Sequence, residues 1–122
     1  MGVDLCEVER MRRSLARTAG LADRLFTTGE QAYCRTARDP AERFAVRFAA
    51  KEATLKALGA GLGACRLRDI EVVRSESGAP ALVLHDTAAA LAAEQRVTRW
   101  HLSLSHTATM AEAVVVAVAV AV

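Results

Sequence analysis

The chain has 122 residues, of which 52% are apolar but only 4% are aromatic, and its formal net charge is +2. This length fits one compact domain with a substantial core, and the predominance of Ala and Val favours closely packed helices and thin strands. So small a net charge gives no general argument for binding nucleic acid or a membrane surface. We therefore predict one domain over residues 1–122 with neither kind of partner.

The chain opens with a short extended segment. Residues 2–5 suit a strand, and because only Met1 precedes them we expect this strand to be short, or the true start to lie upstream. Asp4 lies near its end, where an aspartate is usually a turn or capping residue. Asp4 alone is therefore weak evidence of a functional site.

An amphipathic helix is predicted over residues 6–19, because apolar residues recur there at helical spacing. Its polar side carries Arg10, Arg13 and Arg17, which are spaced so that they share one face. Such a face is most often simply solvated. The alternative is a docking surface for an acidic protein partner, to which Met11 adds an adaptable apolar contact.

A second helix is predicted after a short break. Residues 21–26 should form an apolar turn. The helix should then start at a threonine cap, either Thr27 or Thr28, and run to about Arg38. We expect Tyr33, in its middle, to be a core residue.

The longest predicted helix lies at the centre of the chain and has clear ends. Asp39 should be its N-cap and Pro40 its first residue. Glu42 would complete a capping box with Asp39. Gly59 should end the helix.

Glu52 lies on the apolar arc of this central helix. At about 100° per residue, Phe44, Phe48 and Leu55 fall on the same arc. A carboxylate that points the same way as the core must be paired or must bind a cation. The alternative is a surface ion pair with Lys56, four residues on, worth about 0.3–0.5 kcal/mol. We predict that this helix forms the floor of a site.

The second half of the chain reads as strands with one helix. The glycine-rich loop after Gly59 follows a helix end rather than opening a helix, so it does not predict a P-loop. The remaining elements are strands at 69–74 and 81–85 joined by a hairpin turn at 75–80, a helix at 87–95, and strands at 100–107 and 112–120.

In the strand at 100–107, leucines alternate with polar residues, which predicts one apolar and one polar face. Ser105 and His106 are adjacent and so point to opposite faces, which argues against a hydrolytic dyad. His106 is either a packed histidine or a hydrogen-bond donor to a phosphate.

The cysteines and the apolar tail indicate a cytoplasmic protein. Cys6, Cys34 and Cys65 are odd in number and lack metal-ligand spacing, so we expect free thiols in a reducing compartment. We expect no secretory leader. The apolar tail over residues 113–122 is far shorter than the ~20 residues needed to cross a bilayer, so it predicts a buried strand.

Four stretches, in this order, resemble one known family over essentially the whole chain. The central run, with glutamate and lysine four residues apart, is specific, and the shorter stretches gain weight from its presence. The stretches are Gly2-Val3-Asp4-Leu5 with Glu9-Arg10; Arg47-Phe48-Ala49-Ala50-Lys51-Glu52-Ala53 with Lys56-Ala57 and Gly59; Gly78-Ala79-Pro80; and Trp100-His101-Leu102-Ser103-Leu104-Ser105-His106-Thr107. They are similar to holo-[acyl-carrier-protein] synthase, the small bacterial type of 4′-phosphopantetheinyl transferase.

The resemblance implies a fold, an activity and an assembly. The fold is α+β, with an antiparallel sheet packed against a long central helix. The activity is transfer of the 4′-phosphopantetheine arm of coenzyme A to a serine of apo acyl carrier protein, with release of adenosine 3′,5′-bisphosphate, as in fatty acid biosynthesis. The assembly is a homotrimer with active sites at subunit interfaces.

The resemblance also assigns residues. Asp4 and Glu52 become ligands of Mg²⁺, which prefers oxygen donors and retains waters beside one or two carboxylates. Lys56 becomes the catalytic lysine that faces the phosphates, and either Glu52 or a metal-bound water accepts the serine proton. The residues that would hold coenzyme A are Arg47, Lys51, Lys56, Gly59, Pro80, Ser105, His106 and Thr107. The residues that would grip the acidic carrier protein are Arg10, Met11, Arg13 and Arg17.

Two other functions use the same residues. A metal-dependent phosphohydrolase would use both carboxylates with water as the nucleophile and act on coenzyme A without a carrier protein. A non-catalytic domain would keep the basic helix and bind a carrier protein only, although such a scaffold has no need of Glu52 and Lys56. The pattern does not distinguish carrier proteins of fatty-acid, polyketide or peptide synthesis, nor does it address acylated coenzyme A.

Overall fold

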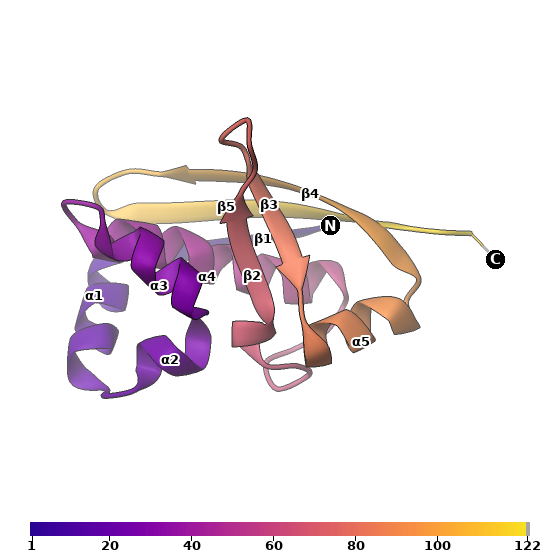
Figure 1. Cartoon of the computed structure of the whole chain (residues 1–122), viewed down its shortest axis with the longest axis horizontal. Helices are drawn as coiled ribbons and strands as arrows, with labels where there is room; N and C mark the ends of the chain where they lie inside the picture. Colours follow the sequence, from indigo (N-terminus) through magenta and orange to yellow (C-terminus); the bar gives the residue numbers. More distant parts are fainter. Residues whose placement is uncertain (122) are drawn as a thin grey trace.

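The structure is a computed structural model that describes residues 1–121. In it, two antiparallel sheets lie around one long helix (Figure 1). That helix, α4 (Pro40–Ala57), is 18 residues long. The helices α1 to α3 gather at one end of the molecule and α5 lies at the other (Figure 1). The α+β fold and the long central helix predicted from the sequence are therefore confirmed.

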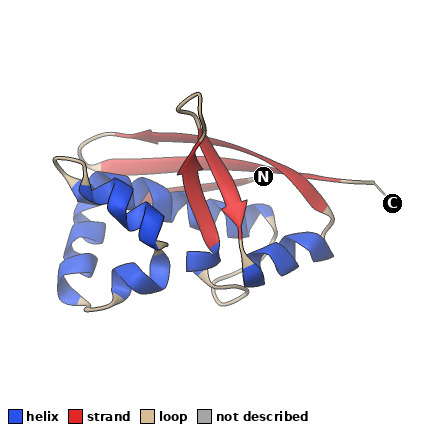
Figure 2. Ribbon diagram, viewed as in Figure 1, coloured by secondary structure: helices blue, strands red, loops and turns tan. Residues whose placement is uncertain are grey.

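The strands form a three-stranded sheet in the order β1-β5-β4 and a separate β2-β3 hairpin, which crosses in front of α4 in Figure 2. The strands are β1 (Gly2–Glu7), β2 (Ile70–Arg74), β3 (Pro80–Leu84), β4 (Val97–His106) and β5 (Met110–Ala119). The remaining helices are α1 (Val8–Arg17), α2 (Leu21–Leu25), α3 (Thr28–Arg35), α5 (Asp86–Glu94) and the short 3₁₀ helix η1 (Leu67–Asp69).

Small residues let α4 lie directly on the three-stranded sheet. Ala49, Ala53 and Ala113 are completely buried where helix and sheet meet. A side chain at Gly2 would collide with the carbonyl oxygen of Ala53, so only glycine allows β1 to approach α4 this closely. This approach brings Asp4, two residues further along β1, next to the helix.

Two predicted segments near the start of the chain differ in the structure. The strand β1 continues to Glu7, since Cys6 and Glu7 pair with Ala111 and Met110 of β5, so α1 begins at Val8 rather than residue 6. The segment predicted as a turn at 21–26 forms the short helix α2 instead.

The two predicted helix starts have different outcomes. Of the two predicted threonine caps, Thr27 is the one that caps α3, and it also forms a full capping box with Glu30. Asp39 does occupy the N-cap position of α4 with Pro40 after it, but its side chain makes no capping hydrogen bond. It binds the Arg12 guanidinium at 2.6 Å instead, so the predicted capping box of α4 is wrong.

The predicted alternation of β4 is confirmed. Leu102 and Leu104 pack against the core under the sheet, whereas His101, Ser103 and Ser105 are exposed. No helix within residues 1–121 has both the length and the apolar character that crossing a membrane requires.

Candidate active site

A cavity of about 840 Å³ lies between β1, α1, α2 and α4. The charged residues of its lining are Asp4, Glu7, Arg10 and Glu52. Its apolar lining comes from Leu5, Met11, Leu21, Leu25, Phe48, Leu62, Leu67 and Met110. The two carboxylates that lie 48 positions apart in the sequence therefore face one cavity, as predicted from the motifs.

Lys56 binds Asp4 rather than Glu52. Its Nζ donates to Asp4 Oδ1 at 2.9 Å and to the Val3 carbonyl at 3.1 Å. The Asp4 side chain is 12% exposed and that of Lys56 is 54% exposed, so the ammonium remains open to solvent. The alternative of a surface ion pair between Lys56 and Glu52 on the same helix is therefore not what the structure shows. Lys56 instead joins α4 to β1.

The carboxylate of Glu52 is destabilised in its charged form. Burial raises its pKa, the neighbouring Asp4 charge raises it further, and Lys56 and Arg10 offset part of the effect. The pKa of Lys56 is raised by its hydrogen bond to Asp4 and by that residue's charge. Bringing two carboxylates together at a cavity mouth favours binding of a cation.

Two carboxylates suit Mg²⁺, but they are too few for a metal ion that is bound by protein side chains alone. No group of three His, Cys, Asp or Glu side chains within residues 1–121 could surround a metal. Mg²⁺ retains waters and substrate phosphates beside one or two carboxylates, which is the donor set that Asp4 and Glu52 provide.

Cys6 also lines the cavity but is a poor nucleophile. Burial raises the pKa of its thiol to about 11, and the Asp4 and Glu52 charges act in the same direction. A thiol with a raised pKa is mainly protonated at neutral pH, which disfavours nucleophilic attack by Cys6.

A second polar cluster surrounds Tyr33. The guanidinium carbons of Arg43, Arg47 and Arg74 lie 4.2, 4.4 and 5.5 Å from the centre of its ring. Arg74 also donates to the Tyr33 hydroxyl at 2.9 Å. We call these four residues the arginine cluster. Tyr33 was expected in the core and is only half-buried. Its contacts with the arginines were missed because they depend on how α4 and β2 pack against α3.

Arg47 is the most constrained member of the arginine cluster. It is only 5% exposed, and its Nε is buried without a hydrogen-bond partner among the described residues. Pro80 pairs with Arg74 in the β2-β3 hairpin and so lies beside this cluster. A buried guanidinium among other arginines favours an anionic ligand.

The other predicted ligand-binding residues lie apart from the cavity. Ser105 and His106 end β4 and Thr107 follows, all three exposed, and His106 Nε2 is 3.5 Å from Glu42. Gly59 lies just beyond the end of α4 with a left-handed φ of 65°. None of the predicted coenzyme A ligands lines the cavity that contains Asp4 and Glu52, which we call the carboxylate cavity.

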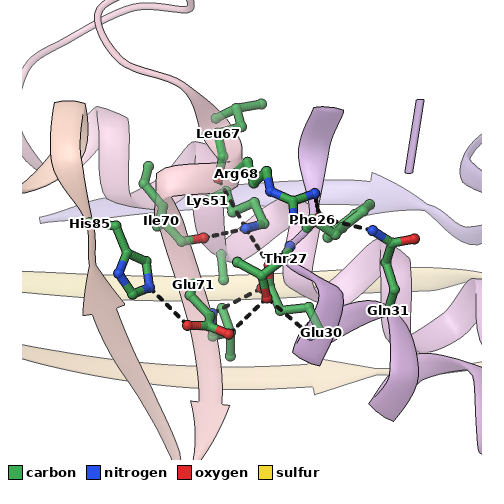
Figure 3. Close-up of polar contacts among 12 residues, drawn as sticks. Phe26, Thr27, Glu30, Gln31, Lys51, Leu67, Arg68, Ile70, Glu71 and His85 are labelled. Carbon is green, nitrogen blue, oxygen red and sulfur yellow. Dashed lines mark hydrogen bonds and ion pairs between the residues drawn. The ribbon is translucent and has the colours of Figure 1, made fainter. Parts of the chain in front are cut away.

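Lys51 cannot contact a ligand, which corrects the assignment made by resemblance. Its side chain is completely buried and its Nζ donates to Glu30 Oε1, the Leu67 carbonyl and the Ile70 carbonyl (Figure 3). These three acceptors use all three of its donors.

The first helix presents the predicted basic face. Arg10, Arg13 and Arg17 are exposed, and Arg10 reaches the cavity lining. Met11 is only 5% exposed and belongs to the core, so its predicted role as an adaptable surface contact is wrong.

Comparison with known proteins agrees with this arrangement. A model of the 4′-phosphopantetheinyl transferase superfamily matches residues 1–119. A holo-[acyl-carrier-protein] synthase from Salinispora arenicola is 51% identical over 119 residues, covering 96% of this chain and 95% of that protein. One from Moorella thermoacetica is 46% identical over 113 residues, covering 93% of this chain and 88% of that protein.

A solved structure has the same fold. The crystal structure of the Helicobacter pylori holo-[acyl-carrier-protein] synthase in complex with coenzyme A superimposes with a TM-score of 0.84. It is 28% identical, and the match covers 96% of this chain and 98% of that one. By its sequence, its fold and the positions of its motifs, the chain belongs to the 4′-phosphopantetheinyl transferase superfamily.

Proposed function

We propose that this chain is a holo-[acyl-carrier-protein] synthase: it transfers the 4′-phosphopantetheine arm of coenzyme A to a serine of apo acyl carrier protein and releases adenosine 3′,5′-bisphosphate. The observation that carries the proposal is the meeting of Asp4 and Glu52 at one cavity, with Lys56 bound to Asp4, in a member of this family. Relatives named for this activity match nearly the whole chain.

Asp4 and Glu52 would hold Mg²⁺ at the cavity mouth. When bound there, the metal supplies positive charge against the diphosphate of coenzyme A, which favours attack at phosphorus. Removal of the metal with EDTA should stop transfer, and added Mg²⁺ should restore it. Full activity in EDTA would contradict this role.

Glu52 is suited to accept the proton of the carrier-protein serine. Burial raises its pKa above the ordinary value, so its carboxylate is a stronger base than an ordinary glutamate. Lys56 has the opposite role. Its solvent-exposed ammonium, held in place by Asp4, can neutralise the departing bisphosphate.

A complete site is proposed to form between two copies of the chain. Within one copy, the arginine cluster and the segment 105–107 are separate from the carboxylate cavity. The outer side of β1 is apolar and open, since Val3 is 48% and Leu5 58% exposed. A homotrimer would cover this face and bring the arginine cluster of one copy to the cavity of the next, where it could hold the phosphates of coenzyme A.

The carrier protein is proposed to dock on the basic face of α1. Arg10 lies at the rim of the cavity, with Arg13 and Arg17 further along the same helix, so an acidic partner would be guided toward Glu52. The free thiols Cys6, Cys34 and Cys65 fit a cytoplasmic location for both proteins.

Intact-mass spectrometry tests the function directly. Apo carrier protein is incubated with coenzyme A, Mg²⁺ and this chain, and the carrier should gain the mass of one phosphopantetheine. Breakdown of coenzyme A without any carrier protein would indicate the phosphohydrolase instead. An unchanged carrier that still binds the chain would indicate a non-catalytic domain.

A further inference from the structure

The buried ion pair of Lys51 and Glu30 connects several parts of the chain behind the active site. Both side chains are completely buried, and Lys51 Nζ lies 2.8 Å from Glu30 Oε1. The same ammonium donates to the Leu67 carbonyl at 3.0 Å and to the Ile70 carbonyl. One side chain of α4 therefore holds the start of α3 and the segment that leads into β2 (Figure 3).

Glu30 extends these contacts to two more backbone groups. Its Oε1 accepts from the Thr27 amide at 3.0 Å and its Oε2 from the Val72 amide at 2.9 Å. Thr27 Oγ1 in turn donates to Glu71 Oε2 at 2.7 Å. Every charged oxygen and nitrogen of the pair is satisfied, so the network has one well-defined geometry.

This network fixes the direction of Glu52. Consecutive residues of an α-helix are about 100° apart, so the rotation that places the Lys51 side chain also determines where Glu52 points. The other side of α4 packs through small residues such as Ala49 and Ala53, while larger side chains such as Phe44 and Leu55 pack elsewhere along the helix. Apolar packing is not directional, so the hydrogen bonds of Lys51 add a directional constraint on the orientation of α4.

The same ammonium also holds one wall of the cavity. Leu67, whose carbonyl accepts from Lys51, contributes to the cavity lining together with Leu25. Lys51 therefore links the helix that carries Glu52 to the wall that lies across the cavity from it.

Stability alone does not explain a buried ion pair. Replacing such a pair by apolar groups of similar size is often neutral or stabilising, and its best-attested benefit is a unique packing arrangement. We infer that Lys51 is a positioning residue: through Glu30, Leu67 and Ile70 it sets the rotation of α4 so that Glu52 faces Asp4, and it does not touch coenzyme A. This inference rests on the proposed function, in which Glu52 is a metal ligand.

The test separates positioning from stability with two variants. Lys51→Met leaves Glu30 buried without a counter-charge and should lower the thermal midpoint strongly. The double variant Glu30→Gln/Lys51→Met buries no charge and should recover most of that midpoint. Its kcat should nevertheless remain reduced by about tenfold to a hundredfold, as expected for a misplaced catalytic group, with the KM for coenzyme A within about twofold of the original.

Mn²⁺ affinity provides a readout that does not depend on turnover. Electron paramagnetic resonance of the chain with Mn²⁺ alone should show affinity lower by about tenfold in the double variant, because second-shell changes of this kind weaken metal sites by 10–100-fold. A matched control is Ala92→Gly on the buried face of α5, a helix that contributes no residue to the cavity lining. It should lower the thermal midpoint but leave kcat and Mn²⁺ affinity unchanged.

Normal kcat and Mn²⁺ affinity in the double variant would overturn the inference and make the pair purely structural. A raised KM for coenzyme A at unchanged kcat would overturn it as well, since Lys51 would then act on the substrate. If the original chain transfers nothing to a carrier protein, the proposed function fails, whereas the Mn²⁺ comparison still decides the positioning role.

Discussion

The Lys56 side chain connects two elements that are far apart in the sequence. It extends from the last turn of α4, yet its ammonium is held by Asp4 and the Val3 carbonyl of β1. This contact holds the ammonium beside Asp4, a position that a flexible surface lysine lacks. We therefore propose that Lys56 has a role in the reaction rather than in stability.

Replacing Lys56 by methionine should affect catalysis more than substrate binding. The methionine keeps the length of the side chain but removes the charge that meets the leaving bisphosphate in the transition state. We expect kcat to fall by roughly 10²-fold and the KM for coenzyme A to rise much less. Steady-state kinetics measures kcat and KM. An unchanged kcat would show that Lys56 is an ordinary surface residue without a role in the reaction.

Glu52 should make the metal-free protein less stable as pH rises. Its pKa in the folded chain is raised above the ordinary value of 4.5, so the folded state binds the proton more tightly than the unfolded state. Stability is therefore lost as pH increases from 4.5 through the folded pKa. Glu52→Gln removes this loss.

The comparison is made by thermal denaturation without metal at pH 4 and pH 7.5. The Glu52→Gln variant should match the original chain at the lower pH and exceed it at the higher pH. Added Mg²⁺ should raise the midpoint of the original chain only, because the variant lacks one ligand. A midpoint difference that does not change with pH would contradict the raised pKa.

At the scale of elements, α1 combines a core face with an exposed basic face. Val8 and Met11 are buried against α4, whereas the arginines point to solvent. Arg12 differs from its neighbours, because its guanidinium binds Glu9 and Asp39 and so ties α1 to the start of α4. Only the unpaired arginines are available to a partner.

The variant Arg13→Glu should weaken recognition of the carrier protein and leave coenzyme A unaffected. Rim charges act mainly on the encounter of two proteins and are screened beyond about 8–10 Å in physiological salt. We expect the KM for the carrier protein to rise about tenfold and its salt dependence to flatten. Arg12→Ala is the matched control on the same helix and should change this KM little. Equal losses toward both substrates would place Arg13 in the fold or in a subunit interface.

At the scale of the whole molecule, the proposed site needs two copies of the chain. The carboxylates face the cavity between β1 and α4, while the buried guanidinium of Arg47 lies with Tyr33 outside that cavity. A single chain would hold the metal but not the phosphates beyond it. Assembly is therefore proposed to be a condition of activity.

Mixing two inactive variants tests this assembly. Glu52→Ala lacks the metal ligand and Arg47→Ala lacks the guanidinium, and each alone should be nearly inactive. After the two are unfolded and refolded together, random assembly should place intact partners at about a quarter of the interfaces and restore about that share of activity. Activity that stays at the level of the separate variants would mean that both residues act within one chain.

Much of this protein could be predicted from local patterns in the sequence. The ends of α4, the alternation of β4 and a threonine cap at the start of α3 depend on residues a few positions apart, and the structure confirms them. The approach of Asp4 to Glu52 was predicted as well, although from the resemblance of the motifs rather than from spacing. Residue spacing predicts such features because it determines which side chains of one helix or strand point to the same face.

Only the tertiary structure decided the partners of the long charged side chains. Spacing on α4 pairs Lys56 with Glu52, and the resemblance assigns Lys51 to coenzyme A. The packing of β1 and α3 instead pairs these lysines with Asp4 and Glu30. Asp39 likewise binds Arg12 instead of capping its own helix. A flexible side chain pairs with whatever element packs across from it. That neighbour is set by contacts between distant segments, such as the glycine that lets β1 lie against α4.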